Sequence, residues 1–127
     1  MRGRGKYGAI KTEVHGITFD SKGESGRYME LKTLQSIGQI YDLQLQVKYE
    51  IFAHDTKICT YIADFVYQDV GGCTVIEDFK GVVTAVFKLK WKLLQAQYRE
   101  DIDAGNLRFL ISKRPSPQRR ARLRARQ

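Results

Sequence analysis

The sequence predicts one mixed α/β (α+β) domain whose elements follow the order αβββαβ. Apolar residues recur at helical spacing in residues 21–38 and 84–104, whereas they alternate with polar residues along three segments between these stretches. A chain of 127 residues, 43% hydrophobic and 28% charged, also suits a single folded domain with its own core. These observations define the fold class, and each element can be justified in turn.

The first helix is predicted in residues 21–38, after two short extended pieces in residues 9–19 that are joined by a turn at Gly16. Ser21 and Glu24 have the spacing of a capping box, in which the serine caps the helix and the glutamate reaches back. Gly38 is predicted to end the helix because glycine accepts the left-handed conformation of a helix C-terminus.

Three strands are predicted to follow as an antiparallel meander. The first covers about residues 40–53, with its odd-numbered apolar residues from Leu43 to Ile51 on one side. The second covers about residues 57–68 and the third residues 73–80. The two glycines at 71 and 72 between them are typical of a tight reversal.

A second helix is predicted in residues 84–104, where two apolar rows would form a wide buried face. The rows are Val86, Leu89, Leu93 and Ala96, and Phe87, Trp91, Leu94 and Tyr98. Gly105 and Asn106 are predicted to end this helix, and residues 107–111 to form a last short strand.

Positive charge is concentrated at the two ends of the chain, whose net charge is +8. Residues 113–127 hold seven basic side chains and no acid, and the first eight residues hold three more. The remaining 12 basic residues face 14 acids, so the body has a net charge of −2. We therefore predict a flexible basic arm at 1–8, a domain at 9–112 and a disordered basic tail at 113–127. Such ends favour a nucleic-acid partner, and the alternative is a solubilising tail without a specific role.

Other patterns narrow the classes of function. No apolar stretch has the length of a membrane helix, and the basic N-terminus has no apolar segment behind it, so we expect a cytoplasmic location. Cys59 and Cys73 lack the paired spacing of a zinc or redox motif and are expected to be reduced. His15 and His54 are isolated and are assigned ordinary surface roles. A glycine-rich phosphate loop is not found, so no nucleotide cofactor is expected.

Acidic residues inside strands give the main functional signal. Alternate strand residues share a face, so a tight hairpin would bring Asp64 close to Asp78 and Lys80. Acids are disfavoured in strand interiors and unpaired buried carboxylates are costly, so a bound hard cation, Mg²⁺ or Mn²⁺, is the economical explanation. The alternatives are an Asp64 that reaches solvent and a surface ion pair between Asp78 and Lys80. The core-type residues expected around this cluster are Ile62, Val66 and Ile76.

Two carboxylates, a cation and an ammonium group suit the hydrolysis of phosphodiesters. A divalent cation polarises the phosphate and generates hydroxide from water. Lys80 would orient that water or stabilise the negative charge that develops on the phosphate.

The succession of Asp64, a hairpin, then Asp78, Phe79 and Lys80 resembles the signature of the PD-(D/E)XK (restriction-endonuclease-like) nuclease superfamily. The similarity extends to a family of small phage and prophage proteins assigned to that superfamily and covers roughly residues 14–111. Ala63 stands where the signature has proline, and Asp78 where glutamate is commoner. The similar stretches are residues 16–24, 62–67, 77–81, 84 and 87–90.

The resemblance implies a restriction-endonuclease-like core, with a mixed central sheet flanked by two helices, and a Mg²⁺- or Mn²⁺-dependent DNA endonuclease. It implies that Asp64 and Asp78 bind the metal and that Lys80 is catalytic. It also implies that Glu24 completes the site as a ligand or base, and the alternative is a partner of Ser21 in the capping box. Glu30 is the alternative acid on that helix, and a bulge would exchange Asp78 for the adjacent Glu77.

Further residues are candidates for binding DNA, either duplex or branched. Lys88 and Lys92 would contact phosphates, and Gln46 would meet substrate or metal, or be a simple exposed strand residue. The tail candidates are Arg119, Arg120 and Arg122.

Cutting both strands usually needs two active sites, so a homodimer through the second helix is expected. Resolution of Holliday junctions in phage DNA metabolism is the specific activity that the resemblance suggests by analogy. The alternatives are a non-catalytic nucleic-acid-binding module on the same fold and a structural protein of a phage particle.

Overall fold

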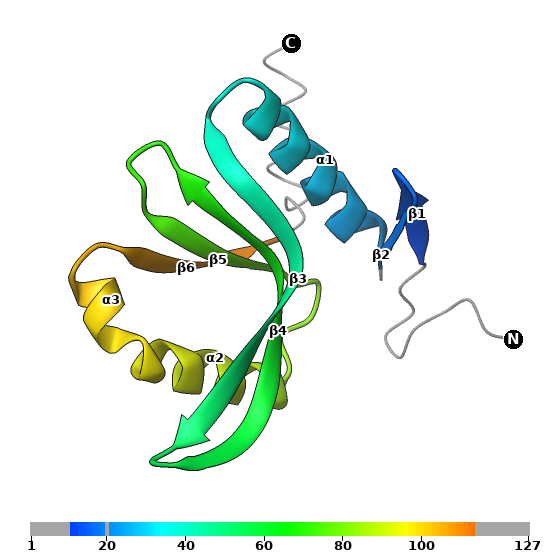
Figure 1. Ribbon diagram of the computed structural model, residues 1–127. Helices are drawn as coiled ribbons and strands as arrows, with labels where there is room; N and C mark the ends of the chain where they lie inside the picture. Colours follow the sequence, from blue (N-terminus) through cyan, green and yellow to red (C-terminus); the bar gives the residue numbers. More distant parts are fainter. Residues whose placement is uncertain (1–10, 20, 114–127) are drawn as a thin grey trace, which may run out of the picture.

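The computed structural model, which describes residues 11–19 and 21–113, has a mixed α+β architecture built on a four-stranded sheet (Figure 1). The predicted order of elements is confirmed, with a small hairpin before the first helix and a break in the second. The predicted arm at 1–8 lies outside the described residues, as do the tail residues 114–127 with Arg119, Arg120 and Arg122. The elements are β1 (Thr12–Val14), β2 (Ile17–Phe19), α1 (Lys22–Ser36), β3 (Ile40–Ala53), β4 (Thr56–Asp69), β5 (Thr74–Phe79), α2 (Ala85–Gln97), α3 (Arg99–Asp103) and β6 (Leu107–Ser112).

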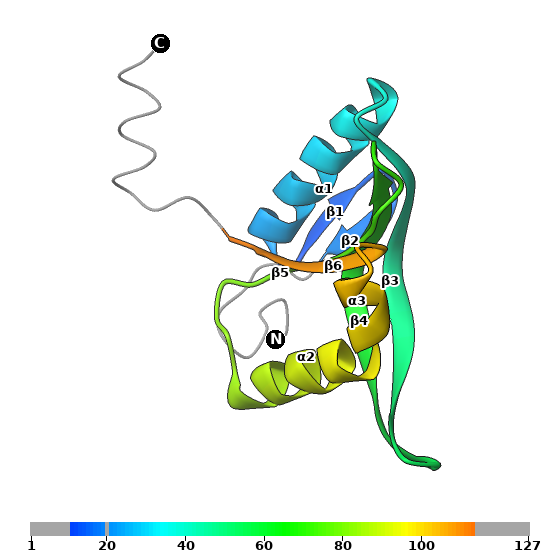
Figure 2. The ribbon, with the colours of Figure 1, turned by 90° about the vertical axis from the view of Figure 1, so that its left-hand side faces the viewer.

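The main sheet has the strand order β3-β4-β5-β6, while β1 and β2 form a separate two-stranded sheet. Strands β3, β4 and β5 pair antiparallel as the predicted meander, and β6 pairs parallel to β5 after the crossover through α2 and α3. Figure 2 shows β5 and β6 passing between α1 and α2, so the two helices lie on opposite sides of these strands. The parallel pair is what makes the sheet mixed.

Helix α1 begins and ends as its sequence predicts. The Ser21 hydroxyl accepts a hydrogen bond from the Glu24 N–H at 3.1 Å, which satisfies a backbone donor of the first turn. At the other end Gly38 has φ +78°, in the left-handed region, and its N–H donates to the Gln35 carbonyl at 3.1 Å. Local sequence therefore fixes both boundaries of the helix that lies against one side of β5.

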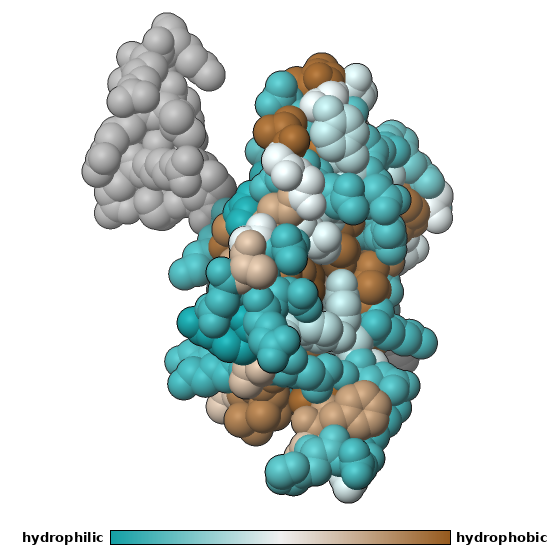
Figure 3. Space-filling view, turned by 60° about the vertical axis from the view of Figure 1, so that its left-hand side comes forward, coloured by the Kyte–Doolittle hydropathy of each residue, from teal (hydrophilic) through white to brown (hydrophobic). Residues whose placement is uncertain are grey.

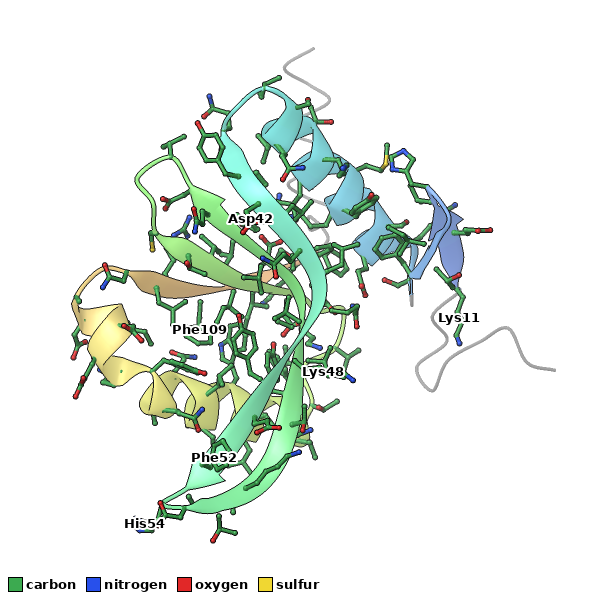
Figure 4. The ribbon with its side chains drawn as sticks, in the orientation of Figure 1. Lys11, Asp42, Lys48, Phe52, His54 and Phe109 are labelled. Carbon is green, nitrogen blue, oxygen red and sulfur yellow. The ribbon has the colours of Figure 1, made fainter. Side chains whose placement is uncertain are left out.

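The core consists of two hydrophobic clusters, one beneath each long helix. The first joins α1 to the sheet through Tyr28, Leu31 and Phe65, and the second joins α2 to the sheet through Phe87, Leu94 and Ile76. Figure 4 shows Phe109 on the side of β6 that faces α2, where its ring meets Trp91 edge-on at 5.1 Å between centroids. Each cluster therefore presses on a different face of β5.

The hairpin of β3 and β4 passes from one cluster to the other. Leu43 and Leu45 pack with the first cluster, whereas Val47, Tyr49 and Ile51 pack with the second, so the predicted single row of β3 is divided between them. The change falls at Gln46, whose φ of 53° lies in the left-handed region between the pairs Leu45–Phe65 and Val47–Ala63.

Strand β4 also divides its side chains between the two clusters, and this bears on the prediction for Ile62. On β4, Tyr61 and Ala63 face the second cluster and Phe65 faces the first. Ile62 consequently points outward and is 46% exposed, so the prediction that it lines the site is wrong. Val66 and Ile76 are buried as predicted.

Helix α2 is shorter and less buried than its sequence suggests. The predicted helix breaks at Tyr98, where Gln97 is held by β3 through the Phe52 N–H and the Glu50 carbonyl. The row of Phe87, Trp91, Leu94 and Tyr98 packs in the second cluster. In the other row Val86 is 65% and Leu89 60% exposed, and Ala96 is also exposed. The prediction that these three residues belong to a wide buried face is therefore wrong. The hairpin and β5–β6 cover one side of α2 alone.

The surface carries several exposed apolar side chains. In the view of Figure 3 they form separate patches within a mostly hydrophilic face. Cys59 and Cys73 are free thiols, as predicted, and both are half-buried. No helix in residues 11–19 and 21–113 is long and apolar enough to cross a membrane.

Candidate active site

Asp64 and Asp78 lie beside each other where the pairing of β4 and β5 ends. The main-chain register between these strands runs from Gln68–Thr74 to Phe65–Glu77. Beyond this pair, side-chain carboxylates accept the hydrogen bonds between the strands. The Asp64 N–H donates to Asp78 Oδ1 at 3.2 Å, and the Phe79 N–H donates to Asp64 Oδ2 at 3.0 Å. Each acid therefore braces the backbone of the other's strand, and the predicted proximity of the two acids is observed.

The Asp78 carboxylate is fully buried and incompletely satisfied. Its side chain has no exposed surface, and its Oδ2 atom has no hydrogen-bond donor among the described residues. Burial raises the pKa of Asp78 to about 6, partly opposed by the Lys80 ammonium and the Asp64 N–H. A buried acceptor without a donor is costly, so this atom is where a ligand would be most stabilising.

Lys80 lies on the same side of β5 as Asp78, as the alternation predicts. Its Nζ atom is 3.9 Å from Asp78 Oδ1 and 4.5 Å from the centroid of the Phe87 ring. The Lys80 side chain is about one quarter exposed, whereas that of Asp78 is buried. The ammonium group thus lies at the solvent edge of the acid pair, held over an aromatic face.

Glu77 points to the other side of β5 and is fully engaged there. Its Oε2 accepts from Arg27 Nε at 2.6 Å, and its Oε1 accepts from Arg27 Nη2 at 3.1 Å and from the Tyr67 hydroxyl at 2.6 Å. The hydrogen bond to Glu77 raises the pKa of Arg27, and burial together with Glu77 raises the pKa of Tyr67. The geometry therefore joins Asp78, and not Glu77, to Asp64 and Lys80.

Glu24 is buried in the first turn of α1. Gly23 beside it packs on Phe79, so that a Cβ added to Gly23 would come within 2.5 Å of the Phe79 ring. The capping role predicted from Ser21 is observed at the Glu24 N–H. Within the described ranges no three or more histidine, cysteine or acidic side chains are arranged to hold a metal ion, so Glu24 as a ligand stays a prediction.

Of the remaining candidate residues, Gln46 contacts the acid pair, whereas no such contact is seen for Lys88, Lys92 or Glu30 among the described residues. Gln46 is exposed and its Nε2 donates to Asp64 Oδ1 at 3.4 Å, so it belongs to the site. Lys88 and Lys92 are exposed on α2, where the structure shows no contact that would define a role. Glu30 lies away from the acids, with an exposed carboxylate 3.4 Å from Arg27 Nη1.

Sequence reasoning missed Arg27 and Tyr67, which hold Glu77. The signal was present in part, because Glu77 sits in an apolar strand and a buried carboxylate needs a partner. Arg27 is four residues before Leu31 on the buried row of its helix, a position where a basic residue is unusual. Nothing in the sequence indicates that Arg27 and Glu77, 50 residues apart, meet.

The acid pair can accept a hard divalent cation. Mg²⁺ is usually held by one or two carboxylates with several waters retained, and Asp64 with Asp78 supplies such a set, including one buried oxygen without a donor among the described residues. Lys80 places a positive charge at the edge of this set, where a phosphate would approach. The residues present therefore fit such an ion.

The chain belongs to the family described as "Protein of unknown function (DUF1064)", which matches residues 4–109. Comparison with curated proteins and with solved structures finds no match. The family's description names no activity, so an inference about function must come from the site.

Proposed function

We propose that this protein is a metal-dependent DNA endonuclease with a restriction-endonuclease-like fold. The observation that carries the proposal is the buried Asp78 carboxylate. Its Oδ2 lacks a hydrogen-bond donor among the described residues, and its Oδ1 accepts from the Asp64 N–H and lies 3.9 Å from Lys80 Nζ. A buried carboxylate in that condition is stabilised by a bound cation, and Mg²⁺ is usually held by one or two carboxylates.

Each residue has a distinct part in the proposed reaction. Asp64 and Asp78 would hold Mg²⁺ or Mn²⁺, which when bound polarises the scissile phosphate and lowers the pKa of water. Lys80 donates hydrogen bonds to the attacking water or to a phosphate oxygen, and Gln46 orients Asp64 through its amide. The water would give up a proton to a base, a role proposed for Glu24, as its oxygen bonds to phosphorus. The bond from phosphorus to the sugar oxygen breaks, and the leaving oxygen takes a proton from water. Glu24 is proposed as a further ligand or base from the start of α1.

The proposal extends to the substrate and the assembly. Lys88 and Lys92 on α2, together with the basic ends of the chain, would contact DNA phosphates. The exposed apolar side chains of Val86 and Leu89 on α2 offer a surface to a second copy, and paired copies would cut both strands. Branched DNA such as a Holliday junction is the proposed substrate, in the cytoplasm of a bacterial or phage-infected cell.

The test is cleavage of defined DNA by the purified full-length chain. Linear, supercoiled and four-way-junction DNA are incubated with Mg²⁺, with Mn²⁺ and with a chelator, and we expect cleavage only with metal. Asp78→Asn and Lys80→Ala should each lower the rate by at least about 100-fold while DNA binding persists. Matched exposed positions, Asp103→Asn and Lys32→Ala, should retain the activity.

Two results would overturn the proposal. Salt-sensitive DNA binding without cleavage of any substrate would favour a non-catalytic nucleic-acid-binding module. Cleavage that survives Asp78→Asn would assign the activity to another site or to a contaminating nuclease.

A further inference from the structure

The Glu77 carboxylate is buried next to the proposed metal site but takes no part in the proposed chemistry. It has no exposed surface and accepts three hydrogen bonds, two from Arg27 on α1 and one from Tyr67 on β4. Both of its oxygens are therefore occupied by protein donors. A carboxylate satisfied in this way has little to gain from a metal ion.

The position of Glu77 in the sheet gives this ion pair a second consequence. Glu77 is the last residue of β5 that pairs with β4, and Asp78 follows it directly. Successive strand residues point to opposite faces, so holding Glu77 against α1 directs Asp78 to the face that carries Lys80. A slip by one residue would exchange the two acids.

The ion pair also links two elements that carry site residues. Arg27 is three residues after Glu24 on α1, and Glu77 is one residue before Asp78 on β5. The hydrogen bonds of 2.6 and 3.1 Å between Arg27 and Glu77 thus fasten the start of α1 to the end of β5. Gly23 permits the close approach, because a Cβ there would lie within 2.5 Å of the Phe79 ring.

We propose that Arg27 and Tyr67 are positioning residues for the metal site, which act by holding Glu77 on the α1 face so that Asp78 alone meets Asp64. This inference rests on the proposed function. It assigns the choice between the two adjacent acids to a fixed ion pair and not to strand alternation alone.

The experiment measures Mn²⁺ binding to the full-length chain by electron paramagnetic resonance, with circular dichroism to confirm folding of each variant. Arg27→Met keeps the aliphatic part of the side chain and removes both hydrogen bonds. We expect it to weaken Mn²⁺ binding by about 10-fold or more, in the range typical of outer-shell residues. Glu30→Gln is the matched control, because it removes the exposed partner of the same arginine, and it should leave the Mn²⁺ affinity unchanged.

A double variant separates positioning from mere structural support. In Arg27→Met the released Glu77 carboxylate can take the place of Asp78 beside Asp64 through the one-residue slip, which turns Asp78 away from the cation. Adding Glu77→Gln removes that competitor, so the double variant should regain most of the Mn²⁺ affinity without regaining thermal stability. A purely structural ion pair predicts no such recovery.

Milder variants keep the test decisive if Arg27→Met does not fold. Tyr67→Phe removes a single hydrogen bond to Glu77 and should weaken Mn²⁺ binding by about 5-fold, below the usual range for outer-shell losses. Arg27→Lys preserves the charge but not the two-pronged contact, and its effect should lie between those of Tyr67→Phe and Arg27→Met.

The outcomes distinguish this inference from the proposed function. Wild-type Mn²⁺ binding that is lost in Asp78→Asn but unchanged in the folded Arg27 and Tyr67 variants would overturn the positioning role alone. Wild-type protein that binds no Mn²⁺, or binds it only as well as Asp78→Asn does, would overturn the proposed metal site and this inference with it.

Discussion

Glu77 and Asp78 are neighbours on opposite faces of β5, and they differ in how completely their carboxylates are hydrogen-bonded. On the face toward α1, Glu77 is buried and each of its oxygens accepts from Arg27, with Tyr67 as a third donor. On the face toward α2, Asp78 is equally buried, yet its Oδ2 has no donor within the described part of the chain and its ammonium neighbour lies 3.9 Å away.

The difference shows that two equally buried acids can differ in how fully the protein satisfies them. Both carboxylates have lost their water, but only Glu77 has regained full hydrogen bonding from the described part of the protein. Burial disfavours the charged form of Asp78 and raises its pKa to about 6, and the nearby Lys80 ammonium offsets this only in part. The contrast is what the proposed function predicts, with Glu77 satisfied by the fold and Asp78 left with an acceptor that a ligand could satisfy.

Glu77→Gln should produce the largest change in stability. We expect the free energy of unfolding to fall by about 3 kcal/mol, because the half-buried Arg27 loses its counter-charge. Urea denaturation followed by circular dichroism measures the change. Asp103→Asn removes an exposed ion pair and should change stability by less than about 1 kcal/mol. Equal losses in the two variants would contradict the structural role assigned to Glu77.

Asp78→Asn should raise the free energy of unfolding, in contrast to Glu77→Gln, and the gain should depend on pH. Because the pKa of Asp78 rises from 3.8 to about 6 on folding, the folded chain binds more protons between these values. Wild-type stability from this group is therefore complete below about pH 4, falls as the pH rises through about 6, and is then constant. The amide introduced by Asp78→Asn keeps an acceptor for the Asp64 N–H without the charge.

The measurement is the difference in unfolding free energy between Asp78→Asn and wild type from about pH 4 to about pH 8, without divalent metal. We expect this difference to grow in favour of the variant by about 2 kcal/mol across the titration of Asp78. A difference that is independent of pH would show that folding does not raise the pKa of Asp78. It would contradict the inference that Asp78, unlike Glu77, is incompletely satisfied.

Gly23→Ala should give the smallest change, through the α1 face of β5. The added methyl group would overlap the Phe79 ring, and we expect a net loss of about 1 kcal/mol after the gain in helix propensity. Gly26→Ala on the same helix meets no atom within 4 Å and should instead gain about 1 kcal/mol. Thermal unfolding of the pair measures the contrast, and equal gains would show that α1 does not press on Phe79.

Local patterns predicted much of the fold and the central part of the site. The Ser21 cap, Gly38 at the helix end and the shared face of Asp78 and Lys80 depend on residues close in sequence, and all are observed. The hairpin at residues 71 and 72 was enough to bring Asp64 to Asp78. Short-range geometry therefore located the acid pair.

Long-range contacts and unusual backbone angles were beyond sequence reasoning. Ile62 is exposed and Gln46 on the neighbouring strand has a left-handed φ, a conformation for which a glutamine gives no sequence signal. Gln97, the last residue of α2, bonds to β3, and the partner of Glu77 lies on another element. Tertiary packing decides each of these features, so no window of sequence contains them.

The hairpin of β3 and β4 has a consequence for cooperativity. Its near half closes the cluster under α1 and its far half closes the cluster under α2, so a single ribbon forms a wall of both cores. Opening either half would expose part of the other cluster, so we expect residues 11–113 to unfold as one unit. Asp64 lies where the two halves of the ribbon meet. The acid pair is therefore fixed in place by the stability of the whole domain, not by that of a local loop.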